Sequence, residues 1–154
     1  MEWYIKWFIR ASLAWFTLGI FLGIAMSAHP AWVVYRPAHA HMNVVGFITM
    51  MIFGVGYQLL PRLFGHPLKS QRLAVTHWWL ANGGLAFIIA GFFMAPNVVG
   101  DASAILTTTG GVLFTLGALA FVINMWRTFD AADARVRASK AASAGGKQLP
   151  TLGE

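Results

Sequence analysis

Two histidines separated by one residue, His39 and His41, stand where a long apolar stretch of the sequence begins. Neutral imidazole is a common metal ligand, so this pair is suited to binding a transition metal or a metal-containing cofactor. Arg36 and Pro37 precede it, and a guanidinium suits bidentate contacts to carboxylates. The pattern predicts either a ligand site, since ionisable groups at membrane depth tend to be functional, or two polar residues bonded to water or lipid headgroups.

The spacing of the two histidines limits what they can do together. Each residue of a regular α-helix turns by about 100°, so side chains two residues apart point about 200° apart. Two imidazoles in this arrangement cannot face one centre. We therefore expect one of them to face the helix bundle and the other to face a neighbour, a second subunit or the membrane interface.

Further candidate ligands lie elsewhere in the chain. A helix over residues 41–60 is about 28 Å long, and His77 is expected opposite its far end, more than about 20 Å from His41. One metal cannot bind both, so His77 is either a separate metal ligand or a packed or interfacial histidine. His29 could reach the same site as His39 and His41, and with Met42 these three would form a copper site.

The elements that position these residues are read from hydropathy. The chain has 154 residues, of which 58% are hydrophobic and only 10% are charged, whereas soluble domains carry about 25% charged residues. A bilayer core requires about 20 apolar residues in a helix. Four segments qualify: residues 3–28, 39–60, 73–94 and 102–126. These predict an all-α integral membrane protein, a four-transmembrane-helix bundle.

The bundle is expected to occupy residues 1–128 and to be followed by a tail over residues 129–154. The first part of this tail is charged and could continue as a short helix. The remainder is rich in glycine, proline and polar residues and is expected to be loose. The predicted organisation is therefore one membrane domain with a tail on the cytoplasmic side.

The positive charges are arranged as in a membrane protein. A net charge of +6 is compatible with nucleic-acid binding, but the cations stand at the ends of the apolar segments, which argues for lipid and against nucleic acid as a partner. Arg36 is the only cation expected on one side of the membrane. By the positive-inside rule both termini are cytoplasmic, in a multi-pass protein of a bacterial or archaeal inner membrane.

Several chemistries are excluded or disfavoured. The chain has no cysteine, which rules out disulfides, thiolate metal sites and covalent haem attachment. The sequence offers no paired carboxylates, no nucleophile beside a base and no phosphate-binding loop, so autonomous hydrolysis is not expected. A haem-binding or electron-transfer subunit fits the residues better than an independent enzyme.

The segment RPAH at 36–39, followed by an apolar helix that ends in YQLLPR at 57–62, resembles the second helix of subunit I in the haem–copper oxidase superfamily. The closest resemblance is to the cbb-type cytochrome c oxidases and the nitric oxide reductases. It covers residues 36–65 well and the rest only as apolar helices. A complete subunit I has many more helices, and those later helices carry the remaining haem and copper ligands.

The resemblance implies an axial ligand for a low-spin haem b. On the Arg-x-x-His spacing this ligand is His39, and on the His-x-Asn spacing it is His41 with Asn43 nearby. Arg36 would pair with haem propionates, and the second axial ligand stays open. A self-contained oxygen-reducing centre is not expected in so short a chain.

The leading hypothesis is a small membrane cytochrome b, with haem b near the outer face. It would act in electron transfer or in binding a diatomic gas such as nitric oxide, as a homo-oligomer or within a larger respiratory complex. A quinol or a cytochrome on the outer face would be its redox partner. The alternatives are a cofactor-free accessory subunit of a redox complex and a copper-binding membrane protein.

Overall fold

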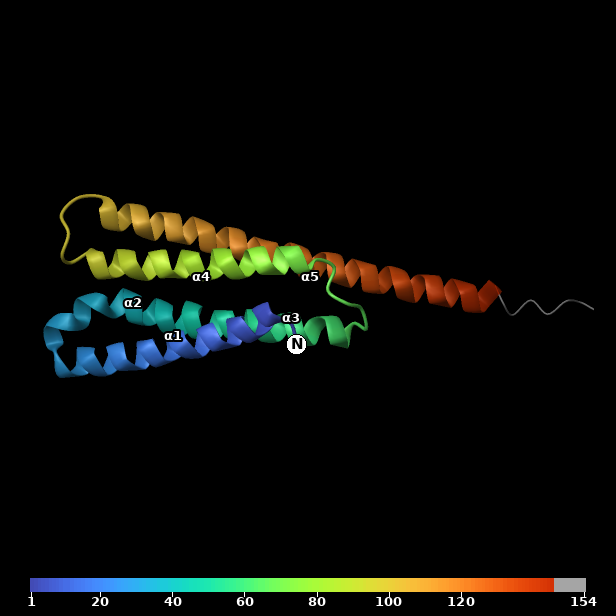
Figure 1. Ribbon diagram of the computed structural model, residues 1–154, viewed down its shortest axis with the longest axis horizontal. Coiled ribbons are helices and arrows are strands. Elements are labelled where there is room, and N and C mark those ends of the chain that lie inside the picture. Colours follow the sequence, from blue (N-terminus) through green and yellow to red (C-terminus); the bar gives the residue numbers. More distant parts are fainter. Residues whose placement is uncertain (146–154) are drawn as a thin grey trace, which may run out of the picture.

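The computed structural model describes residues 1–145, which are almost entirely helical (Figure 1). The elements are, in chain order, α1 (Trp3–Ala28), a 3-10 helix (Pro30–Tyr35), α2 (Arg36–His41), a π-helix (Met42–Thr49), α3 (Met50–Leu63), α4 (Gln71–Met94) and α5 (Ala102–Gly145). Four of these elements follow one another without a break and form one continuous rod: the 3-10 helix, α2, the π-helix and α3. The described chain therefore has four helices long and apolar enough to cross a membrane, as the hydropathy predicted.

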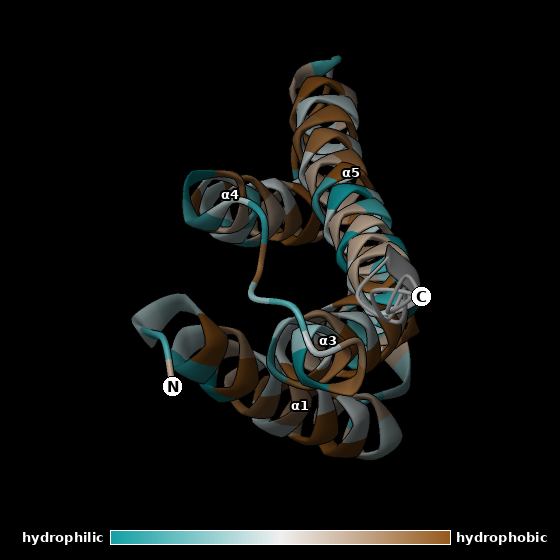
Figure 2. Ribbon diagram, turned by 90° about the vertical axis from the view of Figure 1, so that its right-hand side faces the viewer, coloured by the Kyte–Doolittle hydropathy of each residue, from teal (hydrophilic) through white to brown (hydrophobic). Residues whose placement is uncertain are grey.

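The helices form two antiparallel hairpins that lie against each other (Figure 1). One hairpin pairs α1 with the rod that contains α2, the π-helix and α3, and the other pairs α4 with α5. The end-on view separates these two layers, with α5 passing across the end of α3 (Figure 2). Much of the helical ribbon is brown in this view, with teal segments on α5, at one end of α4 and near the N-terminus. Many large apolar side chains are exposed on the helices, which is typical of surfaces that contact lipid or other apolar helices.

The helix bounds differ from the predicted ones in two places. The helix expected over residues 39–60 begins at Arg36 and ends at Leu63, and it contains a π-helical segment. The helix expected over residues 102–126 continues to Gly145, so the first part of the predicted tail is a helix that projects beyond the bundle (Figure 1). The rest of that tail, residues 146–154, lies outside the described residues.

The two ends of the bundle carry different charges. At one end, here called the Arg36 end, lie the turn from α1 to α2 and the turn from α4 to α5, and Arg36 and Asp101 are the charged residues there. The opposite end, here called the Arg62 end, holds the N-terminus and the loop from α3 to α4. The fold brings the cations near the opposite ends of the four long helices to this end: Lys6, Arg10, Arg62, Lys69, Arg72 and Arg127.

Capping residues define the loop at the Arg62 end. Gly65 has a φ of +63°, a left-handed conformation that glycine adopts without steric cost. Its N–H donates to the Arg62 carbonyl at 3.2 Å, and the His66 N–H donates to the Pro61 carbonyl at 3.1 Å, which closes α3 as a Schellman motif. Ser70 then starts α4, because its hydroxyl accepts from the Leu73 N–H at 3.2 Å.

Small residues spaced seven apart join α4 to α5. A Cβ atom at Gly84 would lie 2.7 Å from the Gly110 carbonyl oxygen, and one at Gly91 would lie 2.8 Å from the Ser103 carbonyl oxygen. Each step of seven along α4 is thus matched by a step of seven back along α5. Such small residues let two helix backbones approach closely in an apolar environment, where packing drives helix association.

The same repeat continues toward the Arg62 end with polar residues. A Cβ atom at Gly117 would lie 3.2 Å from Cδ2 of His77, seven residues before Gly84. One step further, Asn124 Nδ2 donates to the Ser70 carbonyl at 2.7 Å and Asn124 Oδ1 accepts from the Ser70 N–H at 3.1 Å. Asn124 is fully buried, so these bonds tie the start of α4 to the middle of α5.

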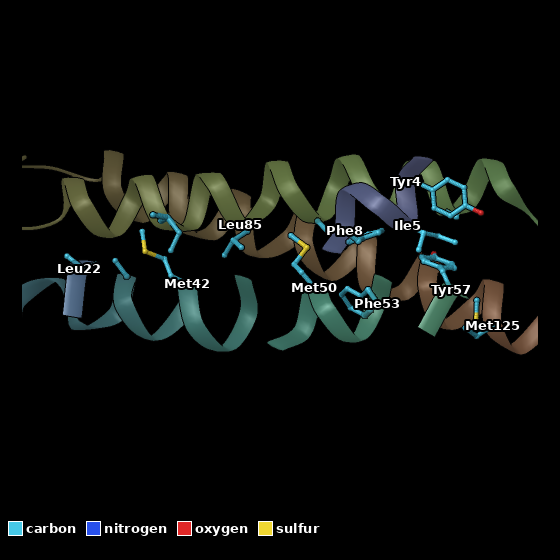
Figure 3. Packing of buried hydrophobic residues seen from close by; sticks show 14 residues of the cluster. Tyr4, Ile5, Phe8, Leu22, Met42, Met50, Phe53, Tyr57, Leu85 and Met125 are labelled. Carbon is cyan, nitrogen blue, oxygen red and sulfur yellow. The ribbon is translucent and has the colours of Figure 1, made fainter. Parts of the chain in front are cut away.

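The densest part of the core lies toward the Arg62 end. Figure 3 shows Phe8 from α1 beside Phe53 and Tyr57 from α3, with Met125 of α5 nearby. The Phe53 and Phe121 rings are 4.9 Å apart, and this contact joins α3 to α5 across the two hairpins. Packing among these aromatic side chains therefore holds the two layers together.

Candidate functional site

His39 points from α2 into the contact with α1. Its Nδ1 lies 2.9 Å from the Gly19 carbonyl oxygen. One turn along, Asn43 Nδ2 donates to the His39 carbonyl at 2.8 Å. If Gly19 carried a Cβ atom, that atom would lie 2.6 Å from Asn43 Nδ2. A Cβ atom on Gly23 would lie 2.9 Å from Cε1 of His39. Two glycines four residues apart on α1 thus make room for two polar side chains four residues apart on the facing rod.

His41 points to the other side of the rod, toward α4. Its ring lies 4.8 Å from the ring of Phe92, and its Nδ1 lies 2.9 Å from the Pro37 carbonyl oxygen one turn earlier. It borders an open hollow of about 250 Å³ together with Ala40, Val44 and Val45. The two imidazoles therefore diverge, as the 100° step between residues predicts.

The hydrogen bonds fix the same tautomer at both histidines. A carbonyl oxygen only accepts, so Nδ1 must carry the proton at His39 and at His41. Each Nε2 then holds a lone pair, and among residues 1–145 neither Nε2 has a hydrogen-bond partner. Metal-binding histidines commonly have this arrangement, in which one ring nitrogen donates to a carbonyl and the other is free to ligate.

A π-helical segment follows the histidines directly. It spans Met42–Thr49, and the Thr49 hydroxyl donates to the Val44 carbonyl five residues earlier at 3.0 Å. Gly46 lies in its middle, and a Cβ atom there would lie 2.6 Å from Cβ of Trp15 on α1. π-Helical turns are rare and occur frequently at functional sites. Here the segment lies next to α1 immediately after the two histidines.

The remaining residues of the predicted copper site are not gathered around this pair. His29 is exposed at the end of α1 and packs beside Trp32, with ring centroids 5.5 Å apart. Met42 is buried in the apolar core. Within the described part of the chain, no group of three or more His, Cys, Asp or Glu side chains is close enough to hold a metal ion.

Arg36 is exposed at the first residue of α2, and its side chain forms no hydrogen bond within residues 1–145. It precedes His39 by three residues and His41 by five. On a helix, residues three apart are neighbours on one face, whereas residues five apart are about 140° apart. Arg36 therefore shares a face with His39 rather than with His41.

His77 lies in the core toward the Arg62 end of the bundle. Its Nδ1 is 3.0 Å from the Tyr57 hydroxyl, and its ring is surrounded by Phe8 at 4.8 Å, Phe53 at 4.4 Å and Phe121 at 5.7 Å. The side chain is fully buried, and Nε2 has no partner among the described residues. The sixteen helical steps from His41 to Tyr57 span roughly 24 Å, so His77 is remote from the histidine pair.

The surroundings of the histidines decide which of them has room for a haem. At His39 the ring edge that carries Cε1 and Nδ1 lies against Gly23, where a Cβ atom would be 2.9 Å from Cε1, 3.4 Å from Nδ1 and 3.8 Å from Nε2. A macrocycle does not fit between this edge and α1. At His41 the open hollow lies on the outer surface of the rod. Of the two imidazoles, that of His41 therefore has the more open space beside it.

Two contacts of the structure were not predicted from the sequence: that of Gly19 and Gly23 with Asn43 and His39, and that of Tyr57 with His77. The first contact could have been predicted, because the spacing of four residues from Gly19 to Gly23 equals the spacing from His39 to Asn43 on the facing helix. The contact between Tyr57 and His77 could not have been predicted, because it depends on how α4 lies against α3.

A family model described as cytochrome c and quinol oxidase polypeptide I matches residues 4–143 of this chain. A cbb3-type cytochrome c oxidase subunit from Stutzerimonas stutzeri is 27% identical over 157 aligned residues, which cover 81% of this chain and 32% of the relative. A cytochrome c oxidase subunit 1 from Rhodobacter capsulatus is 28% identical over 128 residues, or 68% of this chain and 24% of the relative.

A shorter match extends the comparison to a third bacterium. A cytochrome c oxidase subunit 1 from Thermus thermophilus is 34% identical over 67 residues, which cover 42% of this chain and 59% of the relative. The chain spans only about a third or less of the length of the first two relatives. The similarity therefore reaches almost the whole of this chain but a minor part of those subunits.

Proposed function

Since the chain belongs to the haem–copper oxidase subunit I family, we propose that it is a small b-type haem-binding subunit that transfers electrons within a respiratory membrane complex. His41 is the proposed axial ligand. The observation that supports this choice is its geometry: Nδ1 is held by the Pro37 carbonyl at 2.9 Å, and Nε2 is free beside an open hollow. Neutral, oriented imidazole is the form that binds haem iron.

The haem would lie at an interface with another chain, either a second copy or a larger subunit. This follows from the lack of room at His39 and from the outward direction of His41. The second axial ligand would come from that neighbour, and bound haem would supply one-electron redox chemistry near the Arg36 end. Arg36 stands at the same end but on the face of the helix that carries His39, where its exposed guanidinium is suited to a lipid phosphate.

The placement in the membrane is part of the same proposal. The cations gathered at the Arg62 end favour a cytoplasmic location for that end and for both termini, in a bacterial or archaeal inner membrane. The Arg36 end would then face the outer side, where a quinol or an external cytochrome would exchange electrons with the haem. The relatives are bacterial oxidase subunits, which supports a place in a larger respiratory complex.

A second function is favoured by a separate observation. An open hollow of about 420 Å³ on α3 is lined entirely by apolar residues, and large apolar side chains are exposed on the helices, with Phe21 at 65% and Trp79 at 64% exposure. A chain of this kind can serve as a cofactor-free accessory subunit that packs against a larger oxidase. The experiment that tests the first function also tests this one.

The test is the visible spectrum of the detergent-purified protein, oxidised and reduced, with and without carbon monoxide. We expect a sharp b-type reduced spectrum that His41→Ala abolishes and His39→Ala retains, with His66→Ala as a control in an exposed loop. Insensitivity to carbon monoxide would support six-coordinate haem and electron transfer, because a diatomic needs an open position. Haem-free protein after haem-replete expression would leave the accessory subunit as the function, and copper bound in its place would support the copper site.

A further inference from the structure

A groove lies beyond the bundle at the Arg62 end, between α5 and the loop that follows α3. Its volume is about 400 Å³. Side chains of two kinds line it: the apolar Phe64, Ala132 and Val136, and the polar Arg135, Ser139 and Lys140. Phe64 packs against Phe129 with ring centroids 4.4 Å apart, which fixes the loop against the helix.

The lining residues of α5 form one face of the helix. They are Ala132, Arg135, Val136, Ser139 and Lys140, and steps of three and four residues keep them on one side. This face carries two cations and no carboxylate. Asp130 is turned about 150° from the centre of this face, and Asp133 about 90°, which places Asp133 at the edge of the face. The residues that line the groove therefore carry a net positive charge.

The position of the groove along α5 relates it to the membrane surface. Trp126 is 67% exposed, and tryptophans concentrate at the boundary between membrane and water. Arg135 follows it by nine residues, which is about 13 Å along the axis. Side chains on a helix lean toward its N-terminus, so Arg135 and Lys140 lean back toward the bilayer. The apolar floor contributes Phe64, 46% exposed, and Val136, 51% exposed.

We propose that this groove binds an anionic phospholipid. Its phosphate would be held by Arg135 and Lys140, with the Ser139 hydroxyl as a further donor, and its glycerol and upper acyl chains would cover Phe64 and Val136. A basic pocket with an apolar floor beside a membrane helix is suited to acidic lipid headgroups, whereas a zwitterionic lipid brings its own cation to the same place. The site involves none of the residues proposed to hold haem, so an experiment on lipid binding tests it independently of the proposed function.

The test is native mass spectrometry of the full chain in detergent micelles, titrated with phosphatidylglycerol or with phosphatidylcholine of the same acyl chains. The test variant is Arg135→Gln/Lys140→Gln. The matched control is Arg127→Gln/Arg137→Gln, which removes the same charge from the opposite side of α5. All of these residues are exposed, and elution as a single species verifies that the variants are folded.

We expect phosphatidylglycerol to bind the wild type preferentially. The test variant should bind it roughly 25-fold more weakly, since each cation near an acidic membrane surface contributes roughly fivefold, while the control should change by less than about threefold on the same scale. An equal loss of phosphatidylglycerol affinity in the test and control variants would show that binding depends on net charge alone, and it would overturn the proposal. So would equal affinity for phosphatidylcholine, or displacement of the lipid by inorganic phosphate alone, which would identify a free-phosphate site instead.

Discussion

Adjacent glycines on α4 offer a sharp test of the helix packing. Gly84 faces α5, whereas Gly83 has open space where a side chain would begin. Replacing each in turn with alanine adds the same methyl group to the same helix one residue apart. Both changes gain the higher helix propensity of alanine, about 1 kcal/mol at most. Only Gly84→Ala also introduces a clash, so the difference between the two variants isolates the packing term.

The size of that clash follows from the coordinates. A Cβ atom at Gly84 would lie 2.6 Å from the Phe114 backbone nitrogen and 2.7 Å from the Gly110 carbonyl oxygen, against 3.4 Å for an ordinary contact. The obstacle is backbone, which cannot rotate away, so α5 must shift by about 0.8 Å. Overpacking of this kind costs about 1–3 kcal/mol. For a chain of this length each kcal/mol lowers the melting temperature by roughly 2–4 °C, which predicts a loss of roughly 5 °C.

The assay is thermal unfolding in one detergent, followed by tryptophan fluorescence and by the amount of monodisperse protein that remains after heating. Gly83→Ala should melt at or slightly above the wild-type temperature, and Gly84→Ala below it. One kcal/mol of stability corresponds to a change of roughly 2–4 °C in the melting temperature. A difference of less than about 1 °C between the two variants would therefore refute the close approach of α4 and α5 at this point. A clear loss in Gly83→Ala would contradict its position on the open side of α4.

Three further substitutions test other parts of the structure. Asn124→Ala removes two hydrogen bonds to the start of α4 and should lower the free energy of unfolding by roughly 2–4 kcal/mol. The measurements are the melting temperature, which should fall, and hydrogen exchange in the first turn of α4, which should become faster. Unchanged exchange in that turn would contradict the contact. Tyr57→Phe leaves Nδ1 of His77 buried without a partner and should cost about 1–3 kcal/mol, and a double-mutant cycle with His77→Leu should show a coupling above about 0.5 kcal/mol. Gly23→Ala should displace the ring of His39 and lower stability while leaving any haem spectrum intact; loss of that spectrum would transfer the ligand role to His39.

The helices and their ends could be read from the sequence because length and hydropathy set them. An apolar run of about 20 residues is long enough to cross a membrane whatever its neighbours are, and α1 and α4 begin and end close to the predicted residues. The π-helix over Met42–Thr49 could not be read in the same way, since hydropathy does not distinguish α from π hydrogen bonding. The continuation of α5 to Gly145 was expected only as a short charged helix.

The divergence of the two histidines was predictable because it depends only on the rotation per residue. The amount of open space beside each imidazole could not be predicted, because it depends on where α1 packs. Gly23 brings its backbone against the ring of His39, whereas His41 borders an open hollow. The environment of His77 likewise depends on three other helices, which supply Phe8, Tyr57 and Phe121.

The sevenfold repeat between α4 and α5 has a consequence for how the hairpin finds its alignment. If α5 slid by two turns, His77 would face Gly110 and Gly84 would face Ser103, so the small residues alone would tolerate the slipped arrangement nearly as well. The buried side chain of Asn124 removes this degeneracy, because after such a slip Gly117 would face Ser70, and the Ser70 N–H and carbonyl would lose the side-chain amide that pairs with both of them. One amide thus selects among alignments that packing leaves almost equivalent, as a single polar residue does in the seam of a coiled coil.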